Sequence, residues 1–244
     1  DAGSTPGGGC YGKGIDFGAE HQESFFPTDT PAATRRIRIG DGVFSDVFSY
    51  CLRFQRTGTF RSTDIGVANV AFANTFQGIE IDGADRASVV GCQFRKILRY
   101  VDEPQFGRAI VIQNATGVSV MGCQFDGAET ATFGYPNAFP PSAPATRTSG
   151  FAITIDTSRH VALIGNVFED GADGHVIFDV GDGEDGLYGP VALIGNLFRT
   201  SLYPTFANYN VVTLGRSATR RIVGGLLLGN MINSTPLEAS PSSA

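Results

Sequence analysis

The chain has 244 residues, of which 42% are hydrophobic and 17% are charged, and this balance excludes a disordered protein. The formal net charge of −6, with no cluster of Lys and Arg along the sequence, argues against a nucleic acid or an anionic membrane as partner. No apolar run reaches the ~18 residues of a membrane-spanning helix, so membrane insertion is not expected.

Seven short segments alternate strictly between apolar and polar residues, which is typical of a strand with one buried face. In chain order they cover residues 14–18, 51–55, 78–82, 109–113, 152–156, 175–179 and 211–215. The stretches between them show no helical period, and Gly, Asp, Asn and Ser turns are frequent. The sequence therefore predicts an all-β protein in which similar strands recur.

A second motif, V-x-L-x-G-N-x-F, lies between these segments. Residues 161–168 (VALIGNVF) and 191–198 (VALIGNLF) are its clearest copies. Looser copies cover residues 37–44, 70–76, 88–94, 118–125 and 225–232. When the copies are aligned, one column contains mostly Asn and Cys, and its members are Asp41, Asn74, Cys92, Cys123, Asn166, Asn196 and Asn230.

Units this short cannot bury a hydrophobic face alone, but stacked units can. We therefore expect a parallel β-helix, in which each strand pairs with its equivalent in the next coil about 4.8 Å away. Ile, Val and Leu would stack into one apolar wall. A second wall would consist of Phe76, Phe94, Phe125, Phe168 and Phe198.

The column of Asn and Cys should lie at a tight turn. There an Asn can adopt a left-handed backbone and form hydrogen bonds to the coils above and below. Cys92 and Cys123 take the place of Asn in adjacent coils. They would be either two stacked buried thiols or a disulfide.

With these octets and alternating strands, the sequence resembles the pectate-lyase-like superfamily of right-handed parallel β-helix proteins. This superfamily includes polysaccharide lyases, polygalacturonases and phage tailspikes. The resemblance implies one all-β, right-handed solenoid domain over residues 1–244, with coils over about 14–233 and irregular ends at 1–13 and 234–244. It also implies about seven coils and a carbohydrate ligand on an outer face. The polygalacturonase motifs Asn-Thr-Asp, Asp-Asp and Gly-His-Gly are missing, so no catalytic residues are carried over.

One outward column of the alternating strands is rich in carboxylates and amides. Asp156 and Asp179 fall on adjacent coils in it, and two carboxylates about 5 Å apart can divide into an acid and a base. We expect this pair to be catalytic, assisted by His175, Asp82 and Glu80. The alternative is that these aspartates cap strand corners.

Three long insertions follow an octet and precede an alternating strand, at residues 95–108, 126–150 and 199–210. In register they project from the same edge of the stack, which often marks the binding face of a repeat protein. Their aromatic rings can stack on sugars, or they can instead fold the loops onto the body. The predicted substrate-binding residues are Gln55, Gln113, Arg108, Tyr100, Phe106, Tyr135, Tyr203 and Tyr209.

Residues 179–186 (DVGDGEDG) interleave carboxylates with glycine, a composition that can wrap a Ca²⁺ ion. The candidate ligands are Asp179, Asp182, Glu184 and Asp185. The alternative is a solvated acidic turn, and the predicted chemistry requires no cofactor.

These patterns predict an extracellular, cell-surface or virion protein that binds and cleaves a polysaccharide, as a glycosidase or a lyase of the tailspike depolymerase type. The resemblance to tailspikes implies a homotrimer. The alternative is a non-catalytic binding or structural module of a spike, adhesin or surface protein. An enzyme should bring two or three carboxylates together, whereas such a module should hold each carboxylate against local backbone.

Overall fold

The computed structural model of the chain describes residues 3–4, 10–11, 14–17, 35–47, 50–56, 61–75, 77–97, 108–126, 151–169, 174–178, 187–200, 210–214, 221–222 and 224–234. The regular structure of these residues is entirely β. No helix that could cross a membrane occurs among them.

Three parallel sheets of seven strands each contain most of the described residues. The first sheet contains β3 (Ile15–Phe17), β6 (Tyr50–Phe54), β9 (Gln77–Asp82), β12 (Arg108–Gln113), β15 (Phe151–Asp156), β18 (Gly174–Phe178) and β22 (Asn210–Leu214). The second contains β4 (Arg38–Gly40), β7 (Ser62–Ala68), β10 (Ala84–Val90), β13 (Thr116–Met121), β16 (Arg159–Ile164), β20 (Val191–Ile194) and β24 (Gly225–Leu228). The third contains β5 (Val43–Ser45), β8 (Ala71–Thr75), β11 (Gln93–Ile97), β14 (Gln124–Asp126), β17 (Val167–Glu169), β21 (Leu197–Thr200) and β25 (Met231–Ser234).

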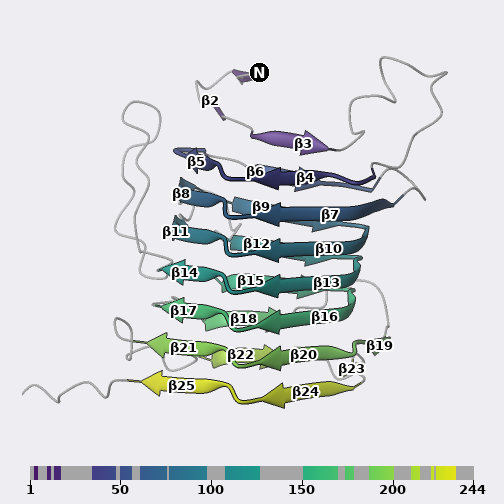
Figure 1. Ribbon diagram of the computed structural model, residues 1–244, viewed down its shortest axis with the longest axis vertical. Helices are drawn as coiled ribbons and strands as arrows, with labels where there is room; N and C mark the ends of the chain where they lie inside the picture. The colour runs from purple at the N-terminus through teal and green to yellow at the C-terminus, as the bar shows by residue number, and fades with distance from the viewer. Residues whose placement is uncertain are drawn as a thin grey trace, which may run out of the picture.

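The chain visits the three sheets in a fixed order, from first to second to third and back to the first. We call one such passage a repeat. Each strand pairs with its equivalents in the neighbouring repeats, so the repeats are stacked along the molecule (Figure 1). The predicted all-β class and the stacking of equivalent strands are confirmed.

Two small sheets lie outside this pattern. Strands β1 (Gly3–Ser4) and β2 (Cys10–Tyr11) pair antiparallel, in a region that was predicted to be irregular. Strands β19 (Leu187–Tyr188) and β23 (Arg221–Ile222) pair in parallel. Both small sheets lie outside the three stacked sheets that contain the repeats.

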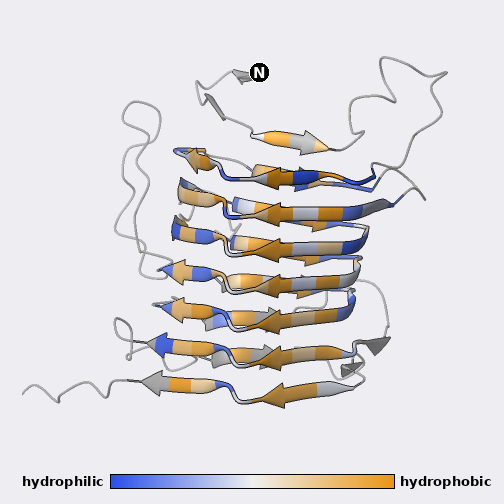
Figure 2. Cartoon of the chain, viewed as in Figure 1, coloured by the Kyte–Doolittle hydropathy of each residue, from blue (hydrophilic) through white to orange (hydrophobic). Residues whose placement is uncertain are grey.

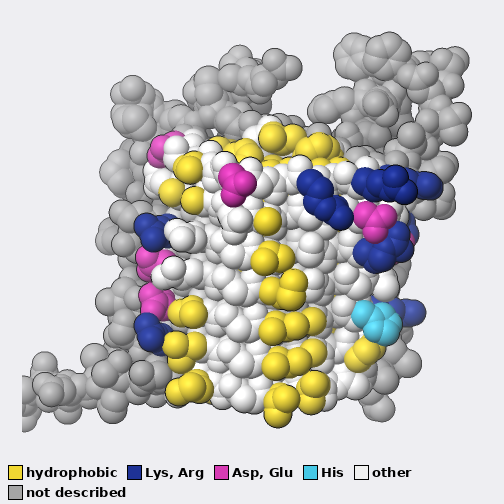
Figure 3. Space-filling model, viewed as in Figure 1, with side chains coloured by type: hydrophobic (Ala, Val, Ile, Leu, Met, Phe, Trp, Pro, Cys, Tyr) yellow, Lys and Arg dark blue, Asp and Glu magenta, His cyan; other side chains and the backbone are white. Residues whose placement is uncertain are grey.

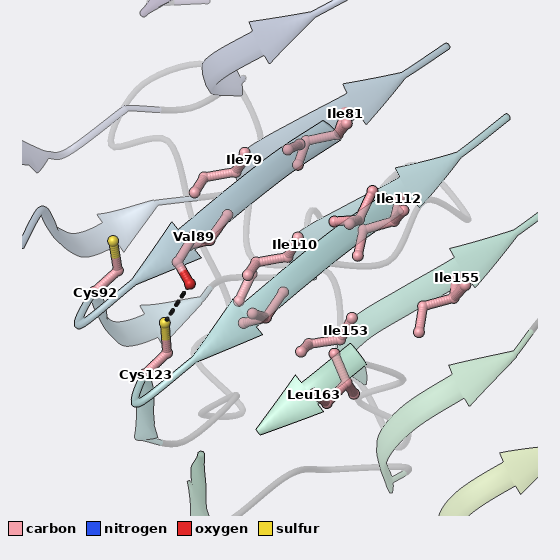
Figure 4. Close-up of a cluster of buried hydrophobic side chains, with 14 of the residues drawn as sticks. Ile79, Ile81, Val89, Cys92, Ile110, Ile112, Cys123, Ile153, Ile155 and Leu163 are labelled. Carbon is pink, nitrogen blue, oxygen red and sulfur yellow. Dashed lines mark hydrogen bonds between the residues drawn. The ribbon is translucent and has the colours of Figure 1, made fainter. Parts of the chain in front are cut away.

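The predicted aliphatic wall is present on the inner side of the first sheet. Ile79 and Ile81 pair in register with Ile110 and Ile112, and the columns continue to Ile153 and Ile155. All six side chains are at most 3% exposed. Figure 4 shows them stacked from strand to strand, and Figure 2 shows hydrophobic residues recurring at matching places along the strands.

The aromatic wall is present with one correction. In the second repeat the position was assigned to Phe76, but Phe72 of β8 is the residue that pairs with Phe94 of β11. Phe76 itself lies outside the described residues. Consecutive rings have centroids 4.7–5.5 Å apart and are nearly parallel. The stacked rings are Phe44, Phe72, Phe94, Phe125, Phe168 and Phe198.

Removal of a ring from the middle of this stack should destabilise the protein strongly. Phe168 is fully buried, and its ring centroid lies 4.7 Å from that of Phe125 and 4.9 Å from that of Phe198. We expect Phe168→Ala to lower the free energy of unfolding by about 3 kcal/mol, because it leaves a cavity. Phe44→Ala, at the half-buried end of the stack, should cost about 1 kcal/mol. Urea denaturation measures both, and equal losses would contradict the stack as a core element.

The turn between the second and third sheets has a backbone different from the predicted one. The left-handed residue comes first, and the ladder residue follows it. The left-handed residues have φ between 53° and 63°, and they are Asp41, Asn69, Gly91, Gly122, Gly165, Gly195 and Gly229. The backbone bonds between repeats place the ladder at Gly42, Val70, Cys92, Cys123, Asn166, Asn196 and Asn230. Asp41 and Asn74 were therefore assigned to the ladder wrongly.

The ladder side chains bond the repeats together. Asn166 Nδ2 donates to the Val120 carbonyl at 3.0 Å, and Asn196 Nδ2 donates to the Leu163 carbonyl at 2.9 Å. Cys92 and Cys123 are free buried thiols, and Cys123 Sγ donates to the Val89 carbonyl at 3.7 Å (Figure 4). The thiols thus replace the Asn amide as donors to the equivalent carbonyls.

Candidate functional site

The outer face of the first sheet carries the predicted polar columns. Arg53 of β6 pairs in register with Glu80 of β9, and Asp82 of β9 pairs with Gln113 of β12. Gln113 pairs in turn with Asp156 of β15. The predicted register of these outward columns is confirmed. Polar side chains from three repeats therefore meet on one strip of the sheet, and we call Arg53, Gln77, Glu80, Asp82 and Gln113 the carboxylate cluster.

Glu80 is the centre of this cluster and is only 5% exposed. Gln77 Nε2 donates to Glu80 Oε2 at 3.2 Å, and Gln113 Nε2 donates to Oε1 at 3.5 Å. Arg53 Nε lies 3.5 Å from the same Oε1. Both oxygens therefore have side-chain donors, one from β9 itself and the others from its neighbours β6 and β12, and none of these partners is backbone.

Burial raises the pKa of Glu80 above its usual range. The Arg53 guanidinium opposes this effect, and the negative charge of Asp82 adds to it. Desolvation disfavours the ionised carboxylate more than Arg53 and the Gln77 amide favour it. A carboxyl that keeps its proton to higher pH than usual is suited to act as a general acid.

The raised pKa has a consequence for stability against pH. Protonation of Glu80 favours the folded state below the unfolded pKa of about 4.3, and this contribution is lost as the pH rises through the higher folded pKa. Glu80→Gln has no carboxyl group at this position and so does not lose this stabilisation as the pH rises. Its free energy of unfolding relative to the wild type should therefore increase as the pH is raised from about 4 to 8. Urea denaturation across that range measures the difference, and a difference independent of pH would contradict the shift.

Asp82 accepts a hydrogen bond from the turn that follows β12 in the next repeat. Asn114 Nδ2 donates to Asp82 Oδ1 at 2.9 Å, and Thr157 Oγ1 donates to Asn114 Oδ1 at 2.9 Å. Arg56 Nε lies 3.9 Å from the same Asp82 oxygen. The Asp82 side chain is 15% exposed and that of Arg56 is 49% exposed, so the cluster opens to solvent on this side.

Arg53 is fixed as a planar group beside Glu80. Its guanidinium carbon lies 4.5 Å from the centroid of the Tyr50 ring, in cation–π geometry. With the Gln55 amide oriented oxygen towards it, Arg53 Nε donates to Gln55 at 2.7 Å. Gln55 thus belongs to this site as predicted by register, but its described contact is with Arg53.

His175 does not lie on the outer face, where the alternation predicted it. The residue is fully buried, and its ring centroid is 5.6 Å from that of Phe168 and 5.7 Å from that of Phe198. The equivalent position in β9 is Gly78, where an added Cβ would lie 2.7 Å from Phe94 Cε1. This column therefore faces the aromatic stack, and His175 has no access to a ligand on the outer face.

The predicted pair of Asp156 and Asp179 is only half described. Asp156 is half-buried in register with Gln113, and β15 pairs with β18 as far as Ile155 and Phe178. Arg108 is half-buried and in register with Gln77. Nine predicted residues lie outside the described ranges, namely Asp179, Asp182, Glu184, Asp185, Tyr100, Phe106, Tyr135, Tyr203 and Tyr209.

No three His, Cys, Asp or Glu side chains converge as metal ligands in the described part of the chain. The predicted Ca²⁺ ligands lie outside the described residues. The three long insertions all connect a strand of the third sheet to the next strand of the first sheet. They therefore leave and enter the stack at the same corner, as the register predicted.

Sequence analysis did not predict Arg53, Gln77 and Asn114 as site residues. Arg53 is in register with Glu80 in the aligned strands, so it could have been predicted from the alignment. Gln77 precedes the alternating segment, and Asn114 lies in a turn, so neither belongs to a strand pattern. In comparisons with known proteins, the chain matches no family model and no curated protein.

Proposed function

We propose that the three sheets form a right-handed parallel β-helix of about seven coils and that the protein binds and cleaves an extracellular polysaccharide. The site would be the outer face of β6, β9 and β12. The observation that carries the proposal is the buried Glu80, whose pKa is raised and which lies beside a second carboxylate, Asp82. Extended parallel strands offer repeated polar groups to a chain of sugars, which suits a polymer better than a small ligand.

Glu80 and Asp82 would act as an acid–base pair. They lie two residues apart on one strand, which separates their Cα atoms by about 6.6 Å. An inverting glycosidase needs its two carboxyl groups roughly 6.5–9.5 Å apart, to leave room for a water, and we propose Glu80 and Asp82 as such a pair. Glu80 would donate its proton to the glycosidic oxygen as the C–O bond breaks. Asp82 would take a proton from the water that attacks the anomeric carbon.

The surrounding polar groups would bind the sugars on either side of the cleaved bond. Gln113 and Asp156 continue the column of Asp82 into the following repeats. The Gln113 amide can donate hydrogen bonds to sugar hydroxyl groups and accept them, and the Asp156 carboxylate can accept them. Arg53 and Tyr50 close the other side of Glu80. This arrangement would orient an extended chain along the stack of repeats.

The alternative is a non-catalytic module that binds a polysaccharide. The side-chain partners of Glu80 favour the enzyme, because a structural carboxylate at a strand corner would bond to local backbone N–H groups. Other sheets of this protein do contain carboxylates in simple ion pairs, such as Glu169, whose Oε1 lies 2.6 Å from Arg199 Nη1. Glu80 differs from them in its burial and in its three side-chain partners.

The test is incubation of the purified chain with a panel of bacterial polysaccharides. Released reducing ends measure cleavage, and ultraviolet absorbance of an unsaturated product separates a lyase from a hydrolase. We expect reducing ends without that absorbance. Cleavage with the absorbance would contradict the hydrolytic pair, and binding without cleavage would identify the protein as a module.

A further inference from the structure

The corner at which the second sheet begins carries a row of left-handed residues. The β-pairing places five residues in one column there, with φ between 55° and 71°. They are Arg36, Asp64, Arg86, Gly117 and His160. Only one of the five is glycine, although a left-handed backbone costs free energy for other residues. Such backbone strain is typical of positions at which the side chain has a functional role.

The same corner concentrates positive charge. Six arginines lie in this column or within three positions of it, against two carboxylates, Asp64 and Asp85. We call these arginines the arginine ridge, and they are Arg35, Arg36, Arg38, Arg61, Arg86 and Arg159. The chain as a whole has a net charge of −6. Figure 3 shows dark blue side chains gathered along the right edge of this face, with a histidine further down, and others at the opposite edge.

Ion pairs do not neutralise the ridge. Arg86 Nε lies 2.7 Å from Asp64 Oδ1, and Arg61 Nε lies 2.9 Å from Asp85 Oδ1. Arg38 donates to the carbonyls of Ile37 and Asp64. Among the described residues, no carboxylate pairs with the remaining three arginines, Arg35, Arg36 and Arg159, and all three are exposed.

The backbone beneath Arg38 is adapted to hold its side chain across the sheet. Gly66 lies in register with Arg38 in the next repeat. A Cβ built at Gly66 would lie 2.8 Å from Arg38 Cδ. Glycine at this position therefore lets the arginine lie flat over β7, where its Nη1 donates to the Asp64 carbonyl.

We propose that the arginine ridge binds an anionic polysaccharide that runs along the stack of repeats. Arginines come from three successive repeats, those of β4, β7 and β10, and Arg159 follows two repeats later. Paired strands lie about 4.8 Å apart, so a polymer with regular negative groups can contact several of these arginines at once. Single-stranded nucleic acids usually require aromatic rings on which bases stack. The described residues 35–38, 61–66, 84–88, 116–119 and 159–162 contain no Phe, Tyr or Trp.

The ridge adjoins the carboxylate cluster. Arg61 Nη2 donates to the carbonyl of Asn114 at 2.6 Å, and the Asn114 amide donates to Asp82. A chain held on the ridge would therefore pass beside Asp82. The choice of a polysaccharide as partner rests on the proposed function, whereas attraction of a polyanion to the ridge does not depend on cleavage.

The test compares two double variants that remove the same charge. Arg36→Gln/Arg159→Gln alters the ridge, and Arg95→Gln/Arg199→Gln alters exposed arginines on the third sheet. Dextran sulfate is the probe and neutral dextran is its control, titrated between about 50 and 200 mM salt. We expect the ridge variant to bind dextran sulfate about tenfold more weakly. Its salt slope should fall by about two, or about one for each lost contact.

The third-sheet variant should bind dextran sulfate within about twofold of the wild type. Equal weakening of the two variants would overturn the proposal, because net charge alone would then explain the binding. Single-stranded DNA that bound more tightly than dextran sulfate, and through the same arginines, would overturn the choice of partner. A protein that binds through the ridge but cleaves nothing would contradict the proposed function and leave the ridge intact.

Discussion

Replacement of Glu80 by Gln is expected to lower the rate of polysaccharide cleavage by about 10²–10⁴-fold, the usual contribution of a general acid. Glutamine keeps the size of the side chain, and its single carbonyl oxygen can accept a hydrogen bond from either Gln77 or Gln113. It has no carboxyl proton to give to the glycosidic oxygen. The loss should appear in the turnover rate, with binding of the polysaccharide little changed.

Two matched variants give this experiment its control. Asp126→Asn removes one exposed carboxylate from the third sheet and should cleave as the wild type does. Asp156→Asn removes the carboxylate two repeats from Asp82 in the same column and should weaken binding more than turnover. Release of reducing ends, measured at several substrate concentrations, separates the two effects. If Asp156→Asn were inactive and Glu80→Gln active, catalysis would belong to the later repeats and the assignment of Glu80 would be wrong.

Much of the fold follows from one-dimensional patterns. Strict alternation placed Ile79, Ile110 and Ile153 in one inner column, and their pairing confirms it. Alternation is reliable here because a strand has a period of two and each strand lies directly over its equivalent. The outward columns of the same strands, with Glu80 and Asp82, were predictable for the same reason.

The sequence alignment was wrong in the second repeat because asparagine adopts the left-handed backbone at two different turns of this repeat. Asn69 takes the left-handed position that Gly91 takes in the next repeat, while Asn74 has a φ of 56° at another corner and bonds to Asp46. Alignment on the letter Asn therefore shifted the second repeat and chose Phe76 over Phe72. A motif defined by its letters cannot separate two turns that need the same backbone conformation.

The arginine ridge was invisible for a different reason. Its members come from four repeats, and Arg35 and Arg159 lie far apart in the sequence. No cluster of Lys and Arg was recognised in the sequence, so Arg35, Arg36 and Arg38 were passed over, while the other members are dispersed along the chain. Stacking converts residues separated by whole repeats into neighbours. His175 shows the converse, since a local pattern predicted an outer position and the column of Gly78 faces the aromatic stack.

Asn196→Ala is expected to lower the free energy of unfolding by about 4 kcal/mol, because it leaves the buried Asn166 N–H without its acceptor, at a cost of roughly 1–3 kcal/mol, and removes further hydrogen bonds of about 1 kcal/mol each. Asn196 is 1% exposed. Its Oδ1 accepts from the Asn166 backbone N–H at 3.0 Å, and its Nδ2 donates to the Leu163 carbonyl at 2.9 Å. Its amide also bonds to the side chains of Asn166 and Asn230. Loss of this residue therefore breaks the ladder on both sides.

The ladder itself supplies the control, since thiols occupy it at Cys92 and Cys123. A thiol can donate to the carbonyl but gives the Asn166 N–H only a weak acceptor. Asn196→Cys should therefore cost about half as much as Asn196→Ala, or about 2 kcal/mol. Asn74→Ala removes an exposed bond to Asp46 and should cost less than about 1 kcal/mol. Urea denaturation followed by circular dichroism, with an unchanged dependence on denaturant, measures all three. Equal losses for the Ala and Cys variants at Asn196 would show that the donor to Leu163 contributes nothing, and the ladder would then stabilise the stack only through its acceptors.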